Sequence, residues 1–162
     1  MQDSLLLIRK VTFKDADCIL DWENNEENWA VSENDSKYSI FDIVALIGEL
    51  QDVKNAKQGR WMICTKEGET PIGCVDLTGI DFENKTAEVG ILIADKNHRR
   101  KGYALMSLQL IEEQAKELEL NKLSCSIHSG NLASIDLFKK CGYQELVEET
   151  KEIYFFEKWL KK

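Results

Sequence analysis

The stretch AEVGILIADKNHRRKGYALM, residues 87–106, changes its character twice within a short length of chain. It begins with an almost continuous apolar run, which is typical of a central β-strand covered on both faces. Then come three adjacent cations, Arg99, Arg100 and Lys101. After Gly102, apolar residues recur at helical spacing. The stretch therefore predicts a strand, a basic turn and a long helix over residues 103–119.

The basic turn has the features of an anion-binding site. A helix N-terminus presents unpaired backbone N–H groups and a partial positive charge. The cations add full charges, and Gly102 lets the backbone approach a bulky anion closely. The turn thus predicts a pyrophosphate site, and a solvated basic turn is the alternative. Neither G-x-x-x-x-G-K-[ST] nor G-x-G-x-x-G, the two common glycine-rich nucleotide motifs, is present.

The rest of the chain is acidic and suits one domain, residues 1–162. It has 21 Lys and Arg against 29 Asp and Glu, for a net charge of −8. This balance argues against nucleic-acid and membrane partners. Without a signal-peptide pattern or a long apolar run, a cytoplasmic protein is expected. The five cysteines lack metal-ligand spacing, so free, buried thiols and no metal site are expected.

Periodicity and turn signals predict the remaining elements. Strands are expected over residues 4–12, 60–65, 70–80, 87–94, 121–128, 143–149 and 151–160. Helices are expected over residues 14–25, 39–53, 103–119 and 131–142. Asp15 and Ser39 are the expected N-caps of the first two helices, and Gly142 is expected to end the last. The buried stripe of the second helix should hold Ile40, Ile43, Val44, Ile47 and Leu50.

Three stretches of this chain resemble the GNAT N-acetyltransferase superfamily. Residues 99–104, RRKGYA, match its [RQ]-x-x-G-x-[GA] signature, and residues 87–95 are similar to its fourth strand. Residues 131–143, NLASIDLFKKCGY, match its later N-x-x-[AS]-x-x-[LI]-[YF]-x-x-x-G-[FY] helix. The resemblance covers essentially the whole chain and is greatest to bacterial spermidine N-acetyltransferases. It implies a single-domain α/β (α+β) fold, with a mixed, mostly antiparallel sheet of six to seven strands and about four flanking helices.

The resemblance also implies that acetyl-coenzyme A is the cosubstrate. Its pyrophosphate would bind at the basic turn, through Arg99, Arg100, Lys101, Gly102, Tyr103 and Ala104. The pantetheine arm would pair with the backbone of Ile91, Leu92 and Ile93, where an N–H group would polarise the thioester carbonyl. Further cofactor contacts are implied for Asn131, Ser134 and Phe138. Asn131 is equally suited to be a helix N-cap.

Acetyl transfer to an amine requires the acceptor to lose a proton, because an alkylammonium with a pKa of about 10.4 is almost fully charged at pH 7. Several relatives relay that proton through a glutamate at the position of Glu88, for which a structural or substrate-binding role is the alternative. His128 is a second candidate proton carrier, or a hydrogen-bonded histidine at a strand end. Phe138 stands where many relatives carry a tyrosine that protonates the leaving thiolate. The thiolate is therefore expected to leave unaided, to take its proton from another group, or to leave so poorly that activity is weak or lost.

The acceptor site is expected in the acidic segment that follows the first helix. Glu27, Trp29 and Glu33 combine carboxylates with an aromatic face, which suits a cation, although a solvated acidic loop is the alternative. The sequence thus indicates acetyl transfer to a primary amine, such as a polyamine or another small cation. Acetylation of protein N-termini or lysines and a non-catalytic coenzyme A-binding domain are the alternatives. A small-molecule amine is the expected partner, and a homodimer or larger homo-oligomer is also considered.

Overall fold

The computed structural model describes residues 6–25, 37–67, 70–99, 102–146 and 152–161. Its strands are β1 (Leu6–Lys10), β2 (Gly59–Thr65), β3 (Pro71–Asp81), β4 (Thr86–Ile93), β5 (Lys122–His128), β6 (Gln144–Glu145) and β7 (Ile153–Trp159). Its α-helices are α1 (Ala16–Asn24), α3 (Ile40–Leu50), α4 (Val53–Ala56), α5 (Tyr103–Glu117) and α6 (Leu132–Lys140). Two short 3-10 helices are η1 (Phe13–Asp15) and η3 (Lys96–His98). All the expected elements are present, and the short α4 is an addition.

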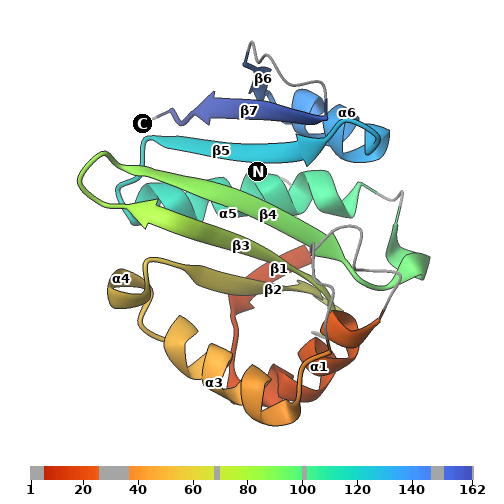
Figure 1. The fold of residues 1–162 in the computed structure, drawn as a ribbon. Coiled ribbons are helices and arrows are strands. Elements are labelled where there is room, and N and C mark those ends of the chain that lie inside the picture. The colour runs from red at the N-terminus through yellow and green to blue at the C-terminus, as the bar shows by residue number, and fades with distance from the viewer. Residues whose placement is uncertain (1–5, 26–36, 68–69, 100–101, 147–151, 162) are drawn as a thin grey trace.

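The seven strands form one sheet in the order β1-β2-β3-β4-β5-β7-β6 (Figure 1). Neighbouring strands are antiparallel except β4 and β5, which run parallel because α5 carries the chain back between them. The predicted mixed, mostly antiparallel sheet is confirmed. The described residues contain five α-helices, against about four expected, and none of these helices is long and apolar enough to span a membrane.

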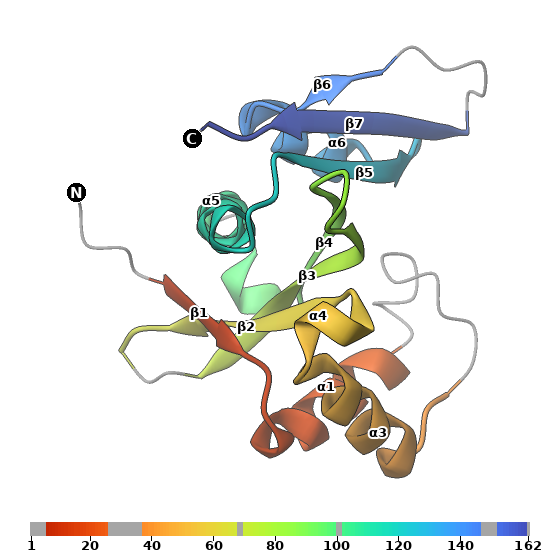
Figure 2. The ribbon, with the colours of Figure 1, turned by 90° about the vertical axis from the view of Figure 1, so that its left-hand side faces the viewer.

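The helices divide between the two faces of the sheet. α5 and α6 pack on one face, where Leu108, Ile111 and Ile135 join the larger hydrophobic core. α1 and α3 pack on the other face and contribute Ile19, Ile43 and Ile47 to a second core. Figure 2 shows β1 and β2 running between α5 and the α1–α3 pair. We call these faces the α5 face and the α3 face.

Alternation along β4 assigns its side chains to these two faces. Ala87 and Val89 are buried on the α5 face, so Glu88, Gly90 and Leu92 lie on the α3 face. In the second half of this strand, Ile91 and Ile93 pack on the α5 face and Leu92 on the α3 face, so the expected cover on both faces is found except at Gly90. Gly90 is exposed, because α1 and α3 leave a space above it.

The N-terminus of α3 follows the sequence prediction. Ser39 Oγ accepts a hydrogen bond from the Asp42 N–H at 3.2 Å, and the Asp42 carboxylate accepts one from the Ser39 N–H at 2.9 Å. Val44, however, is 41% exposed rather than buried. The sheet and α1 cover only the stripe of α3 that carries Ile43 and Ile47, and Val44 is turned away from it.

Asp15 stands at the N-cap position of α1, but the expected cap bond is absent. Its carboxylate is buried and accepts two hydrogen bonds from the Arg9 guanidinium, both of 2.8 Å, and one from the Thr12 N–H at 2.9 Å. Burial raises the pKa of this carboxyl, but the bonds from Arg9 and Thr12 outweigh it, so the pKa is lowered. The Arg9–Asp15 pair thereby joins η1 and α1 to β1.

Two local expectations about small residues are confirmed. Gly142 follows α6 in the left-handed region, with φ of +94°, and ends that helix. All five cysteines are free, four of them buried and Cys18 half-buried. Burial raises the pKa of Cys74 to about 12, so its thiol stays protonated near neutral pH.

Candidate active site

The two parallel strands β4 and β5 separate after a short paired region. Their pairing covers only Thr86 to Glu88 of β4, opposite Lys122 to Ser124 of β5. Both strands then continue, and Figure 1 shows them diverging toward the N-terminus of α5. Beyond this paired region, the β5-side edge of β4 is therefore open among the described residues.

Backbone alternation determines which residues of β4 face that open edge. The Ala94 N–H donates to the Ile72 carbonyl, on the β3 side, while the Ile93 carbonyl accepts from Arg99 Nε at 2.9 Å on the other side. Ile91 and Ile93 therefore direct their backbone groups to the open edge. Leu92 directs its carbonyl toward β3, where a side chain at Gly73 would collide with it. Of the three residues predicted to pair with pantetheine, two are suitably oriented.

The predicted basic turn connects this edge to α5. Asp95 shapes the turn by accepting a hydrogen bond from the Asn97 N–H at 2.9 Å, and its other oxygen lies 2.8 Å from His98 Nδ1. The His98 ring lies against Tyr103, with 5.8 Å between the ring centroids. Arg99 is described, whereas Arg100 and Lys101 lie outside the described residues. The turn is thus held by its own side chains beside the open edge of β4.

The N-terminus of α5 fits an anionic ligand such as a pyrophosphate. No described side chain caps this helix, and its first turn contains no acidic residue. Gly102 precedes it with φ of +79°, and a Cβ on Gly102 would meet nothing within 4 Å. The backbone N–H groups at Tyr103 and Ala104 therefore stand at the positive end of the helix dipole, and no described side chain caps them. The assignment of these residues to the cofactor remains a prediction.

The predicted cofactor residues of α6 have clear structural roles. The Asn131 side chain caps α6 by accepting from the Ser134 N–H at 3.2 Å, so the N-cap alternative is confirmed. Phe138 is buried, and its ring packs edge-to-face against Tyr143 with the centroids 4.9 Å apart. No described residue bonds the buried Tyr143 hydroxyl. Phe138 is thus a core residue here, and its predicted contact with the cofactor stays a prediction.

His128 ends β5 as expected. Its Nδ1 accepts from the Gly130 N–H at 3.2 Å, and its carbonyl accepts from the Asn131 N–H at 2.9 Å. This arrangement matches the alternative of a hydrogen-bonded histidine at a strand end. Only Nε2 is left to carry a proton, because Nδ1 is occupied as an acceptor.

A cavity of about 440 Å³ lies on the α3 face, between α3 and the middle of the sheet. Its sheet side is formed by Arg60, Cys74 and Asp76 together with β4, from Gly90 to Leu92. Its helix side carries Glu23, Tyr38, Asp42, Ile43 and Leu46. We call it the Arg60 cavity. Its lining contains three carboxylates and one guanidinium. It lies over the α3 face of β4, whose edge on the β5 side is open among the described residues.

Arg60 is the central polar group of this cavity, with only 12% of its side chain exposed. Its Nε and Nη2 each donate to an oxygen of Asp76 at 2.8 Å. Its Nη1 lies 3.6 Å from Glu23 Oε1 and has no hydrogen-bond partner among the described residues. Arg60 therefore links two carboxylates that arrive from different elements, and one of its nitrogens remains unsatisfied.

The candidate base Glu88 lies near this cavity but does not line it. It is exposed on the α3 face, opposite Thr78 of β3 and Ser124 of β5. Gly90, two residues further along the same face, does line the cavity. Glu88 is therefore not buried in the sheet, and its role as the base remains a prediction.

The predicted acceptor residues Glu27, Trp29 and Glu33 lie outside the described residues. The two ends of their segment are nevertheless fixed beside the Arg60 cavity, which Glu23 and Tyr38 both line. Asn24 holds these ends together, since its side chain bonds the Tyr38 N–H at 2.7 Å and the Tyr38 carbonyl at 3.0 Å. The described residues on either side of the acidic segment thus lie at the cavity.

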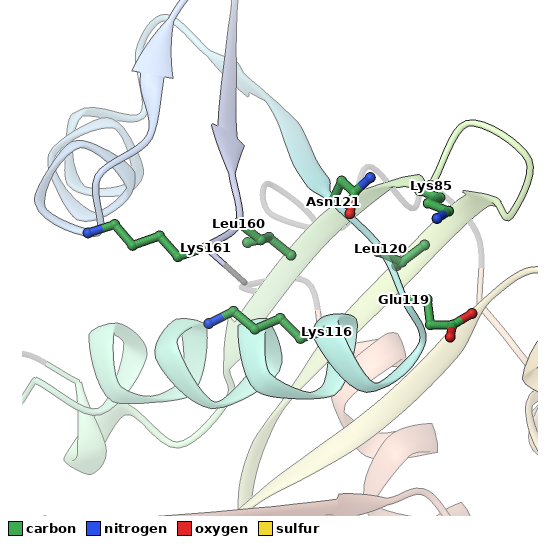
Figure 3. Close-up of a pocket in the computed structure, with 7 residues that line it drawn as sticks. All are labelled: Lys85, Lys116, Glu119, Leu120, Asn121, Leu160 and Lys161. Atoms are coloured by element: carbon green, nitrogen blue, oxygen red, sulfur yellow. The ribbon is translucent and has the colours of Figure 1, made fainter.

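A second cavity, of about 390 Å³, lies far from the predicted site residues (Figure 3). It is bordered by the β3–β4 turn, the end of α5 and the segment after β7. Lys85 and Lys161 stand on opposite sides of it, and Lys116 rises from α5. None of the predicted site residues lines it, and we assign it no role.

Arg60 and Asp76 were not among the residues predicted for the site. Each is a charged residue within a predicted strand that is otherwise apolar, and this contrast was the available signal. Their pairing depends on the register between β2 and β3, which places Arg60 opposite Asp76. Spacing within either strand does not reveal that register.

Comparison with known proteins places this chain among acetyltransferases. The family model described as "Acetyltransferase (GNAT) domain" matches residues 6–144. The chain is similar to the uncharacterized N-acetyltransferase YoaA of Bacillus subtilis, with 24% identity over 147 residues, 90% of this chain and 82% of YoaA.

Solved structures with this fold include spermidine N-acetyltransferase from Vibrio cholerae in complex with CoA and spermine. Its TM-score is 0.85 at 21% identity, over 98% of this chain and 97% of that one. A dodecameric structure of the V. cholerae enzyme has a TM-score of 0.78 at 22% identity, over 98% and 95% of the two chains. These likenesses confirm the fold, and the family match covers both the strand–turn–helix unit and α6. The chain therefore belongs to the GNAT acetyltransferase family, and it is an acetyl-coenzyme A-dependent acyltransferase.

Proposed function

We propose that this enzyme acetylates the primary amine of a small cationic molecule, with polyamines as the first candidates. The observation that carries the proposal is the Arg60 cavity. Its three carboxylates exceed its one guanidinium by two negative charges, and it adjoins β4 where that strand has an open edge. A cation in such a cavity would gain from charge-assisted hydrogen bonds.

The open edge of β4 would hold the acetyl donor. Ile91 and Ile93 offer backbone groups there, and the N-terminus of α5 with Gly102 and Arg99 would receive the pyrophosphate. An N–H group at the edge would polarise the acetyl carbonyl as charge develops on its oxygen. The donor and the acceptor would thus meet at β4, one at its edge and the other on its α3 face.

The reaction itself makes limited demands on the protein. The amine nitrogen attacks the carbonyl carbon, the new C–N bond forms, and the C–S bond breaks with its electron pair left on sulfur. Glu88, exposed on the α3 face, would take the first proton of the ammonium through a water molecule, which frees the lone pair for attack. The second proton leaves the nitrogen as the amide forms and passes to solvent or to the departing thiolate. Phe138 has no proton to donate, and a thiol with a pKa of about 8.5 is a tolerable leaving group without one.

The size of the cavity favours a small acceptor over a protein. Its volume of about 440 Å³ falls in the range typical of small-molecule sites. Spermine bound to the V. cholerae enzyme of the same fold supports the choice of polyamines as first candidates. Acetylation of a protein N-terminus or lysine is the outcome that peptide acceptors would reveal.

The direct test is release of free thiol from acetyl-coenzyme A with a panel of acceptors. The panel contains spermidine, spermine, aminoglycosides, peptides with free N-termini or lysines, and neutral alcohols. We expect the highest kcat/KM with a small amine that carries more than one positive charge. The rate should rise into the mildly alkaline range, because the fraction of amine in the neutral form increases with pH. A preference for peptides or for neutral acceptors would contradict the proposal.

We also propose that the chain forms a homo-oligomer. The V. cholerae enzyme has a dodecameric structure with this fold. On the outer side of α3, Phe41 is 82% exposed and Val44 is 41% exposed, which is unusual for a helix facing water. Light scattering after size exclusion should give a mass that is a multiple of the chain mass. A single-chain mass at micromolar concentration would contradict this.

A further inference from the structure

A row of three residues crosses the sheet beneath the Arg60 cavity. Arg60 of β2 is opposite Asp76 of β3, and Asp76 is opposite Gly90 of β4. All three line the cavity. Side chains in such directly opposed positions stand about 4.5–5.5 Å apart on the same face of a sheet. The row therefore consists of a cation, an anion and a position without a side chain.

No atom of the described residues occupies the place above Gly90. A Cβ on Gly90 would meet no atom within 4 Å, unlike one on Gly73 in β3, which would collide with a backbone carbonyl. Gly90 has no positive φ, so no backbone strain requires a glycine here. The missing side chain leaves room beside Asp76, next to the open edge of β4.

Arg60 fixes the carboxylate that borders this space. Its two hydrogen bonds of 2.8 Å hold Asp76 in the rigid fork of a guanidinium. Each carboxylate oxygen has lone pairs for a further hydrogen bond, and 25% of the Asp76 side chain remains exposed. Asp76 is thus oriented by the protein and still able to accept from a ligand.

The unpaired nitrogen of Arg60 is an N–H donor, so it is left for an acceptor atom of a ligand or for water, and not for the ammonium itself. A buried donor without a partner costs about 1–3 kcal/mol, and such groups are few in native structures. Arg60 Nη1 has no hydrogen-bond partner among the described residues, and the Glu23 carboxylate lies 3.6 Å away from it. A pair that served stability alone would be expected to have this bond completed.

We propose that Arg60, Asp76 and Gly90 form the subsite of the acceptor nitrogen. The ammonium lies above Gly90 and donates to Asp76, and Arg60 is the positioning residue that holds Asp76 in place. This inference rests on the proposed function, whose acceptor it locates. The remainder of the cation extends toward Glu23 and Asp42, the other two carboxylates of the cavity.

Asp76 and Glu88 then have different tasks. Both Asp76 oxygens already accept a hydrogen bond from Arg60, so in this proposal Asp76 orients the nitrogen and Glu88 takes the proton. Loss of the Asp76 charge should therefore raise the KM of the amine and leave the shape of the pH–rate profile unchanged. Loss of Glu88 should instead lower kcat and move the profile to higher pH.

The sharpest test is Gly90→Val, because the space above Gly90 accommodates the new side chain and β-branched residues suit strands. Gly48→Ala on α3 is the matched control, since a Cβ there also meets nothing within 4 Å and Gly48 does not line the cavity. We measure spermidine binding to coenzyme A-loaded protein by calorimetry, and KM for the best amine by thiol release.

Gly90→Val should weaken spermidine binding and raise the amine KM at least about tenfold, with a melting temperature close to wild type. Asp76→Asn should raise the same KM about 10- to 100-fold, the usual worth of a hydrogen bond to a charge. Gly48→Ala should change neither. The subsite is overturned if Gly90→Val and Asp76→Asn both stay within about twofold of wild type.

The same design separates this inference from the proposed function. If no acceptor is acetylated but spermidine binds and Gly90→Val abolishes binding, the proposed function fails and the subsite stands. If small amines are acetylated and neither variant affects them, the proposed function stands and the subsite fails. If spermidine does not bind and no small amine is acetylated, both fail.

Discussion

Two arginine–aspartate pairs lie on the α3 face of the sheet, and they differ in what they leave unused. Arg9–Asp15 and Arg60–Asp76 are both held by two hydrogen bonds of 2.8 Å. Asp15 is buried and accepts a third bond from the Thr12 N–H. Asp76 is partly exposed to a cavity, and one Arg60 nitrogen has no hydrogen-bond partner among the described residues. The Arg9–Asp15 pair, whose hydrogen bonds are complete, thus serves structure. The Arg60–Asp76 pair can still form hydrogen bonds and therefore suits ligand binding.

The largest effect should come from breaking the satisfied pair. Asp15→Asn removes the charge that faces Arg9 in a buried position, and the free energy of unfolding should fall by about 3 kcal/mol. Chemical denaturation with urea measures this. Asp81→Asn is the control, because Asp81 also accepts backbone N–H bonds but is solvated, and it should lose far less. Equal losses in the two variants would break the comparison.

The pH dependence of stability offers a second view of the same pair. Hydrogen bonds from Arg9 and Thr12 outweigh burial and lower the pKa of Asp15 in the folded protein, below its unfolded value of about 3.9. Its contribution is therefore complete above about pH 4 and is lost as the pH falls through the folded pKa. The stability gap between wild type and Asp15→Asn should close in acid. A gap that stays constant down to pH 2 would contradict this.

Substitutions in the basic turn should affect cofactor binding, whereas those in the Arg9–Asp15 pair should affect stability. Gly102→Trp fills the open space at the N-terminus of α5, so the affinity for acetyl-coenzyme A should fall about 100-fold by calorimetry. Gly102→Ala shares the backbone strain of φ +79° without the bulk, and should lose much less affinity. Arg99→Ala should also lose less, because backbone donors remain. Unchanged affinity in Gly102→Trp would refute the cofactor site.

Phe138 is relevant to both stability and catalysis, because it is buried in the core and stands at a predicted cofactor position. Phe138→Tyr should raise kcat about tenfold if the new hydroxyl reaches the leaving sulfur, as one positioned acid can. Because the ring is buried against Tyr143, the added hydroxyl should also lower the free energy of unfolding by about 1 kcal/mol. Steady-state kinetics and urea denaturation check the two effects. A folded Phe138→Tyr without activity would show that the ring packs directly against a substrate.

The fold was predictable because its signals are local. The order of strands and helices follows from periodicity, and the Ser39 cap, the Asn131 cap and the glycine after α6 each involve residues close in sequence. Asp15 stands at the predicted N-cap position, but its bond to Arg9 was not predicted, because Arg9 belongs to a strand whose position the local pattern does not give. Val44 was misread because the width of the covered stripe depends on how α1 packs.

The candidate site also contains residues that are close in sequence and residues that only the fold brings together. Gly102 and the edge residues of β4 stand in one continuous stretch, so a motif was enough to propose them as cofactor residues. Arg60, Asp76 and Gly90 come from three strands and meet only through the registers of β2, β3 and β4. Cross-strand register is a long-range property, and a single strand does not encode it.

The most direct test of the acceptor site follows signals of the protein itself during a titration with amine. In ¹⁵N-labelled, coenzyme A-loaded enzyme, we would record the Gly90 amide and the Arg60 Nε–H while spermidine is added. Gly48 and the Arg9 Nε–H serve as internal references, because the first lies outside the cavity and the second belongs to the satisfied pair. The account predicts that the Gly90 and Arg60 signals shift and saturate while the references stay in place. Acetylation of spermidine with unmoved Gly90 and Arg60 signals would contradict it.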